Sequence, residues 1–204
     1  MKKMMKKGGL ALLMAGLVAV SLTSCLNGND NQQQLTPAET LKAFNTVKGV
    51  RNGKLIYPAR NPKVSTDITD TLDIAWDINT DSTLVIKEFP MKALAENVQN
   101  IELKQLLLTL PNQDLKCRIG FYSVMPAAFL INPIPLTYEV DKEGKKHKLQ
   151  VVFYWNIRGS VGIFNPQKTT LGMQIAEAGI VVDSKLKEEF QRGVFMSMTE
   201  EKKK

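Results

Sequence analysis

The sequence predicts a mainly β (α+β) fold, in which antiparallel strands form a β-sandwich or a partly open β-barrel. Apolar residues alternate with a period of two in many segments, as in "TLDIAWDI" at 71–78, and this pattern is typical of half-buried antiparallel strands. The stretch "DKEGKKHK" at 141–148 is rich in turn residues and joins two alternating runs, which indicates a hairpin. Helical spacing is confined to a few short segments, so strands dominate.

The helical segments lie at the start, the middle and the end of the domain. Thr36 followed by Glu39 is a capping box and predicts a helix that ends near Lys48. Apolar residues at i, i+3, i+4 and i+7 predict a helical pair near residues 90–110, bounded by prolines. The segment "SKLKEEFQR" at 184–192 favours a last short helix.

The remaining apolar segments are predicted to be strands. They begin with "GKLIYP" and continue in short runs to the C-terminal part, where a break is expected near Gly179. Their expected bounds are 53–58, 71–78, 83–89, 115–124, 127–131, 135–140, 148–157, 160–164 and 170–182.

The N-terminus has the pattern of an export signal. "MKKMMKKGG" carries four lysines and no acid, and it precedes an uncharged apolar run from Leu10 to Val20. A membrane-spanning helix needs about 20 apolar residues, whereas a signal peptide needs only about 7–15. The segment is therefore expected to be a cleaved leader.

The residues that end this leader resemble the lipobox of bacterial lipoproteins. Leu22, Thr23 and Ser24 precede Cys25 as an aliphatic residue and two small ones. The resemblance implies cleavage between Ser24 and Cys25, a diacylglyceryl group on the Cys25 thiol, and an acyl chain such as palmitate on its amine. Several chains on one residue anchor a protein stably, whereas one chain does not. The alternative is an ordinary secretory signal with an unrelated cysteine.

These features divide the chain into a signal peptide (1–24), the lipidated Cys25 with a flexible tether (25–35) and a single β-rich domain (36–204). The leader contains four of the 27 basic residues and no acidic ones, so its removal lowers the formal charge from +7 to +3. This charge is spread along the chain. Nucleic-acid binding, which needs a clustered basic face, is therefore not expected.

The lipobox, the step "FPMKAL" at 89–94 and the late hairpin "LTYEV…GKKHKLQVVF" together resemble a family of bacterial lipoproteins catalogued as a domain of unknown function, number 4840. The resemblance implies a cell-envelope protein anchored to a membrane, with no catalytic residues to transfer. Leu26 follows Cys25 in place of the aspartate that retains some lipoproteins in the inner membrane. We therefore expect the outer membrane, with either face possible.

Two motifs suggest chemistry but have simpler explanations. Asp77, Asn79, Asp81 and Glu88 match positions of a calcium-binding EF-hand loop, but Ser82 replaces the required glycine. Strand-like flanks favour a β-hairpin with a polar turn instead, and no metal or other cofactor is expected. The free Cys117 lies in an alternating run and is expected to be a small buried hydrophobe.

The aromatic residues Trp76, Phe153 and Trp155 are candidates for the lining of a ligand cavity, although a filled core would explain them too. The main hypothesis is a non-catalytic binding or structural domain for an envelope protein, a glycan or a small ligand. One alternative is a carrier of small apolar ligands. The other is a hydrolase, which is not the main hypothesis because one histidine and few nucleophiles disfavour an enzyme. A cavity between the two tryptophans would favour ligand binding, and a cleft that gathers His147 with two or more carboxylates would favour the hydrolase.

Overall fold

The computed structural model describes residues 34–59 and 68–201, and the described residues from Leu35 onward form one compact unit. The first helix, α2 (Pro37–Val47), has the predicted capping box. The Glu39 N–H donates to Thr36 Oγ1 at 3.3 Å, and the Thr36 N–H donates to Glu39 Oε2 at 2.9 Å. The Thr36 N–H, together with the Thr36 hydroxyl that donates to Glu39 Oε2 at 2.8 Å, lowers the pKa of the Glu39 carboxyl.

The other helices form the expected pair between two strands, and ten strands make up the rest. The helices are α3 (Met91–Ala95) and α4 (Ile101–Thr109). The strands are β1 (Gly49–Ala59), β2 (Ile68–Thr80), β3 (Thr83–Phe89), β4 (Gln113–Val124), β5 (Ala127–Pro133), β6 (Leu136–Lys142), β7 (Lys145–Phe153), β8 (Val161–Asn165), β9 (Thr170–Val182) and β10 (Lys185–Glu200).

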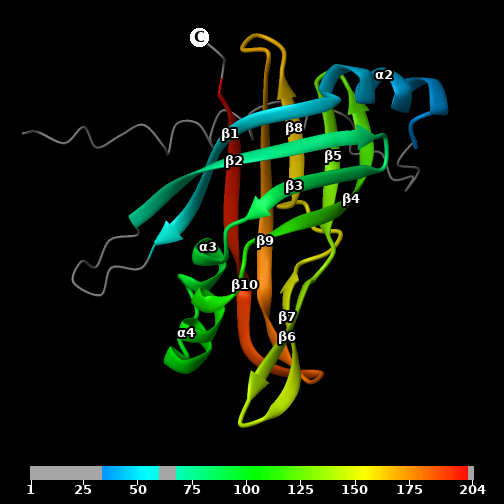
Figure 1. The fold of residues 1–204 in the computed structure, drawn as a ribbon. Coiled ribbons are helices and arrows are strands. Elements are labelled where there is room, and N and C mark those ends of the chain that lie inside the picture. Colours follow the sequence, from blue (N-terminus) through cyan, green and yellow to red (C-terminus); the bar gives the residue numbers. More distant parts are fainter. Residues whose placement is uncertain (1–33, 60–67, 202–204) are drawn as a thin grey trace, which may run out of the picture. The chain divides into compact units, whose positions relative to one another are not determined.

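Eight of these strands close into an antiparallel barrel in the order β10-β1-β2-β3-β4-β5-β8-β9, with β9 paired to β10 (Figure 1). The prediction of a barrel is therefore confirmed over that of a sandwich, and the barrel is closed and not partly open. Beyond β8, the second half of β9 pairs with β7, and β6 follows β7. A four-stranded extension of β6, β7, β9 and β10 therefore continues past the barrel wall.

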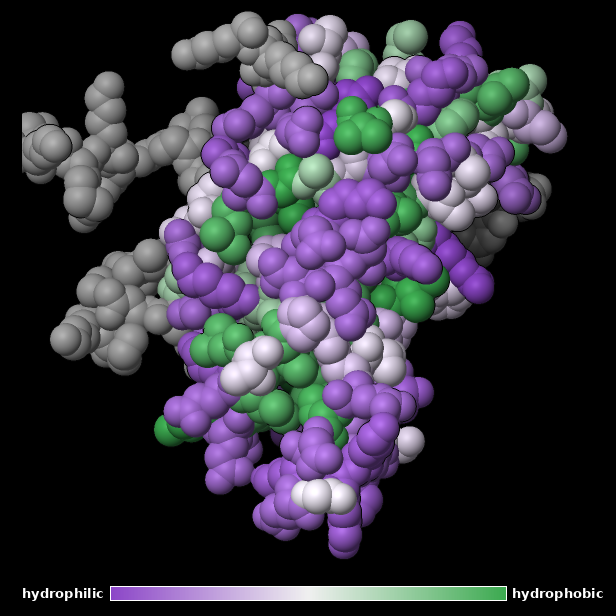
Figure 2. All heavy atoms as spheres, in the orientation of Figure 1, coloured by the Kyte–Doolittle hydropathy of each residue, from purple (hydrophilic) through white to green (hydrophobic). Residues whose placement is uncertain are grey.

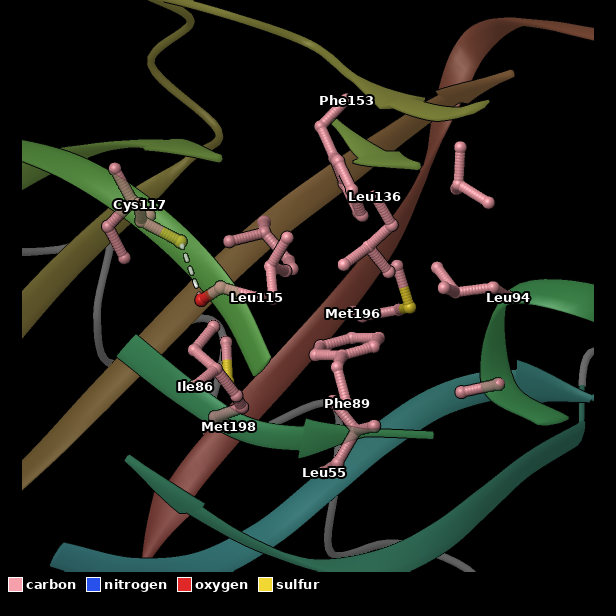
Figure 3. Packing of buried hydrophobic residues seen from close by; sticks show 14 of the residues in the cluster. Leu55, Ile86, Phe89, Leu94, Leu115, Cys117, Leu136, Phe153, Met196 and Met198 are labelled. Atoms are coloured by element: carbon pink, nitrogen blue, oxygen red, sulfur yellow. Dashed lines mark hydrogen bonds between the residues drawn. The ribbon is translucent and has the colours of Figure 1, made fainter. Parts of the chain in front are cut away.

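Side chains fill the barrel. Fully buried residues come from strands around the ring, among them Leu55, Trp76, Ile86, Leu115, Phe129 and Met198, and Figure 3 shows several of them in contact across the interior. Eight strands enclose a space just wide enough for such packing. A Cβ on Gly162 would lie 2.2 Å from the Phe129 ring, so glycine is required there.

Three expectations for the second half of the domain differ from the structure. Residues 184–192 start the strand β10, not a helix, because Asp183 and Ser184 have positive φ and turn the chain back onto β9. Strand β7 ends at Phe153, four residues earlier than expected. No break interrupts β9, which runs continuously from Thr170 to Val182; near Gly179 it has a register shift against both neighbouring strands instead.

Candidate functional site

The proposed lipid anchor lies outside the described residues. Ser24, Cys25 and most of the tether precede residue 34. Within the described part of the chain, no helix is both long and apolar enough to span a bilayer.

The three aromatic candidates do not line one buried cavity. Trp76 in β2 is fully buried and Phe153 at the end of β7 is 8% exposed, so both belong to the core. Trp155 is 65% exposed in the loop after β7. The loop leaves the sheet there because Asn156 has a φ of 54°. The structure thus separates Trp155 from the other two side chains.

The four candidate calcium ligands lie along a β-hairpin, as the simpler interpretation predicted. Strands β2 and β3 pair on both sides of the turn, and Asn79 Oδ1 accepts a 2.6 Å hydrogen bond from the Thr83 hydroxyl. Glu88 follows Lys87, which pairs with Ala75 at a distance from the turn. The EF-hand geometry of two flanking helices is absent from this segment. Across the described residues, no cluster of three or more His, Cys, Asp or Glu could hold a metal ion.

Cys117 is a buried free cysteine in β4, as the alternating pattern predicted. Burial raises the pKa of its thiol far above the ordinary value. A thiol that stays protonated is a poor nucleophile, so its role is packing.

A pocket lies outside the barrel, between α4, the β6–β7 hairpin and the β9–β10 turn. Its volume is about 750 Å³, within the range of small-molecule sites. Figure 2 shows hydrophobic side chains over this region and hydrophilic ones toward the hairpin tips. The lining residues are Asn100, Glu102, Leu103, Gln105, Leu106, Thr109, Val140, Asp141, Lys142, His147, Val182, Asp183, Lys185 and Lys187.

The fold places apolar and charged residues at different parts of this pocket. Leu103 and Leu106 face it from α4, which begins at the N-cap Asn100, whose side chain accepts the Leu103 N–H at 3.0 Å. Val140 from β6 and Val182 from β9 complete the apolar surface. The charged residues come from the hairpin tips and the first turn of α4. The result is an apolar floor with a charged rim.

His147, the only histidine, lies in this pocket with three carboxylates: Glu102, Asp141 and Asp183. Its Nδ1 atom lies 2.6 Å from Asp183 Oδ2, and the Lys148 N–H donates to Asp183 Oδ1 at 2.9 Å. These two hydrogen bonds lower the pKa of the Asp183 carboxyl. The ionised carboxylate accepts, so the His147 Nδ1–H donates.

The charges on the rim differ in how they are compensated. Lys142 Nζ lies 3.6 Å from Glu102 Oε2, and Asp141 Oδ1 accepts a hydrogen bond from the Gly144 N–H at 3.1 Å. Asp183 is engaged by His147. Lys185 and Lys187 are exposed and make no ion pair within the described part of the chain. The lining contains three carboxylates and three lysines, so these formal charges balance.

The comparisons with known proteins identify the family. Residues 46–182 match the family model described as Domain of unknown function (DUF4840). The chain belongs to this family. No curated protein and no solved structure matches it.

The DUF4840 match contains α4, the β6–β7 hairpin and all of β9, so it includes most of the pocket. It ends at Val182, before Lys185 and Lys187. Sequence reasoning missed this pocket, although "ELKQLLLTL" at 102–110 carries leucines on more than the one face that a core-packed helix needs.

The DUF4840 domain also holds a buried carboxyl outside the pocket. Glu177 in β9 is fully buried, and its two carboxyl oxygens have no hydrogen-bond partner among the described residues. Burial, and then the charge of Glu188, raise the pKa of the Glu177 carboxyl well above the ordinary value. Glu177 is therefore expected to be neutral in the folded protein.

Proposed function

We propose that this chain is an envelope lipoprotein, held on the outer membrane through Cys25, whose DUF4840 domain binds a ligand without catalysis. The pocket beside α4 is the binding site. One observation carries this proposal: the barrel interior is filled by side chains, while a pocket of about 750 Å³ with an apolar floor stays open between α4 and the two hairpins. A carrier that holds its ligand inside the barrel would require an empty interior.

The anchor is tested by cell fractionation of Cys25→Ser. Because lipid attachment requires the Cys25 thiol, we expect the wild type in the membrane fraction and most of the variant in the soluble fraction. Cys117→Ser is the control. Because Cys117 is buried in β4, this substitution should leave the fractionation unchanged. Globomycin, which inhibits removal of lipoprotein leaders, should make the unprocessed precursor accumulate. A Cys25→Ser protein that stays with the membranes would reject the anchor.

The binding site is tested with two leucine variants of α4. Leu106 lines the pocket, whereas Leu108 is 49% exposed and does not. A carboxylate at position 106 places a charge on the apolar floor, so Leu106→Asp should lose small molecules that co-purify with the wild type. Leu108→Asp should retain them. The measurement is mass spectrometry of molecules released from protein purified in native-membrane discs. If the wild type and both variants released the same small molecules in the same amounts, the proposed binding site would be contradicted.

A hydrolase is the second candidate, because the pocket gathers His147 with three carboxylates, the arrangement that was expected to favour a hydrolase, and His147 is hydrogen-bonded to one of them, Asp183. Asp183 would orient the ring, and His147 Nε2 would act as general base for a water molecule. We favour binding, since the His147 and Asp183 side chains remain 31% and 49% exposed to solvent.

The two candidates give different results in an ester-hydrolysis assay. For a binding domain, we expect no turnover of nitrophenyl esters that depends on His147. His147→Gln should then have the same background rate as the wild type. A rate that falls at least about a hundredfold in His147→Gln, the effect of losing a general base, would favour the hydrolase.

A further inference from the structure

The barrel and the four-stranded extension meet at a neck, formed by residues 176–179 of β9 and the facing residues 188–193 of β10. The β-ladders on both sides of β9 are irregular at this level. Strand β10 advances from Glu189 to Val194 while β9 advances only from Gly179 to Glu177, and the register with β7 shifts at the same place. Such bulges leave residues unpaired and bend the strand, so the neck is a weak point between two regular sheets.

Glu177 lies where these irregularities meet. Alternation along β9 places it on the same face as Met173 and Ile175, which are buried in the core. Glu177 pairs with Phe153 of β7 and Val194 of β10, and its buried carboxyl oxygens have no hydrogen-bond partner among the described residues. Burial without partners costs far more for a carboxylate than for a neutral acid. The packed neck therefore favours the protonated form, and a neck open to water favours the ionised form.

The charged groups around the neck oppose ionisation in the packed state. Burial raises the pKa of the Glu177 carboxyl, and the charge of Glu188 on β10 raises it further. Glu189 on the same strand is exposed. Tyr154, which follows β7, donates its hydroxyl group to the Phe190 carbonyl at 3.0 Å. Among the side chains that the structure describes, none forms an ion pair with Glu177.

The two walls of the pocket lie on opposite sides of this neck. The connection between α3 and α4 is tied to the barrel, because Asn97 Nδ2 donates to the Pro58 carbonyl of β1 at 2.9 Å. The facing wall consists of the β6–β7 hairpin and the β9–β10 turn, which belong to the extension (Figure 1). The Gln99 N–H donates to Glu188 Oε1 at 3.4 Å and so links the helical pair to the neck. A loosened neck would let the separation of the two walls vary.

We propose that the neck is a hinge controlled by one proton on Glu177. While the carboxyl is protonated, β10 stays packed on β9 and the pocket keeps its observed width. When the proton passes to water, residues 188–193 separate from β9, the carboxylate becomes hydrated, and the extension moves relative to α4. This inference concerns the motion of the domain and does not depend on the proposed ligand binding.

The test is hydrogen exchange of the full-length protein in lipid nanodiscs, measured by mass spectrometry between pH 4 and pH 8. Proteins are compared at the same pH, so the intrinsic exchange rates cancel. In the wild type, the opening constant of the neck should rise about tenfold per pH unit above about pH 4.5, because opening releases one proton. The rise ends at the pKa of the packed state. Glu177→Gln should remove it, because the amide does not titrate.

Two further variants separate the titration of Glu177 from a loss of packing. Glu188→Gln keeps an acceptor for the Gln99 N–H and removes the like charge, which lowers the pKa of Glu177 in the packed state. The rise of its opening constant should therefore end at a lower pH than in the wild type. Glu189→Gln is the matched control on the same strand and should follow the wild type.

The motion of the extension is measured with spin labels on Leu108→Cys in α4 and Glu143→Cys at the exposed tip of the β6–β7 hairpin. Their distance distribution should broaden with rising pH, and Glu177→Gln should keep it narrow.

Three results would overturn the hinge. The first is an opening constant with the same pH dependence in Glu177→Gln as in the wild type. The second is exchange of the neck only together with β2 in the barrel, which would indicate global unfolding. The third is a distance distribution that does not change with pH. If Glu177→Gln does not fold, Glu188→Gln decides, and a rise that ends at the wild-type pH would likewise overturn the proposal.

Discussion

Replacement of Trp76 by alanine is expected to lower the free energy of unfolding by about 3–5 kcal/mol, the usual loss for a large buried aromatic side chain. Trp76 is fully buried in β2 and pairs across the sheet with Arg51 and Ile86. Truncation would leave a cavity that its neighbours in a closed barrel can fill only in part. The measurement is urea unfolding followed by circular dichroism.

Trp155 is the matched control for this prediction, because it is 65% exposed. Trp155→Ala should change the free energy of unfolding by no more than about 0.5 kcal/mol, as is usual for surface positions. Trp76→Phe should lose much less than the alanine variant, since it retains most of the volume and removes the Nε1 donor, which has no partner among the described residues. If Trp76→Ala were as stable as wild type, the barrel would hold a ligand cavity and not a packed core.

The second large effect is expected at Glu177. Because its carboxyl is fully buried without a hydrogen-bond partner in the described residues, the folded state favours the protonated form, and the pKa is raised above the ordinary 4.5. In the unfolded chain the same carboxyl ionises near its ordinary pKa. The contribution of the protonated Glu177 carboxyl to the free energy of unfolding is therefore complete below about pH 4.5. It is lost as the pH rises through the pKa that this carboxyl has in the folded protein.

Glu177→Gln removes this loss, because the amide stays neutral at every pH. Relative to its difference from the wild type near pH 4, the variant should gain stability at pH 8 by about 1.4 kcal/mol for each unit by which burial raises the pKa of the Glu177 carboxyl. Urea unfolding between pH 4 and pH 8 measures the difference. A difference that does not change with pH would show that Glu177 is ionised or paired in the folded protein.

Glu39→Gln is a control of opposite sign. The capping box with Thr36 lowers the pKa of the Glu39 carboxyl, so its contribution is present above the unfolded pKa and is lost as the pH falls through the folded pKa. This variant should therefore be less stable than the wild type at pH 8 and converge with it in acid.

Local features were readable from the sequence because their causes are local. The capping box at Thr36 and Glu39 fixes the start of α2 within four residues. The polar residues between Ile78 and Thr83 form a turn through their own hydrogen bonds. Alternation identified most of the strands, because one face of each packs into the interior.

Features that depend on distant partners were not readable. Leu186 and Phe190 have helical spacing, but pairing with β9 makes this segment a strand. Closure of the barrel depends on β10 meeting both β1 and β9, and no local pattern specifies that choice. The pocket needs residues near 105, 141 and 184 to converge, so its charged tips were interpreted as ordinary solvated turns.

The central claim is that ligand binding takes place beside α4 and not inside the barrel. An experimental density map of the protein, purified from its own membranes in native discs without detergent, tests this most directly. We expect density for a bound molecule between Leu106 and Val182, with Trp76 and Phe129 packed in the barrel. Ligand density within the barrel, or a pocket closed by contact of α4 with the β9–β10 turn, would contradict the claim.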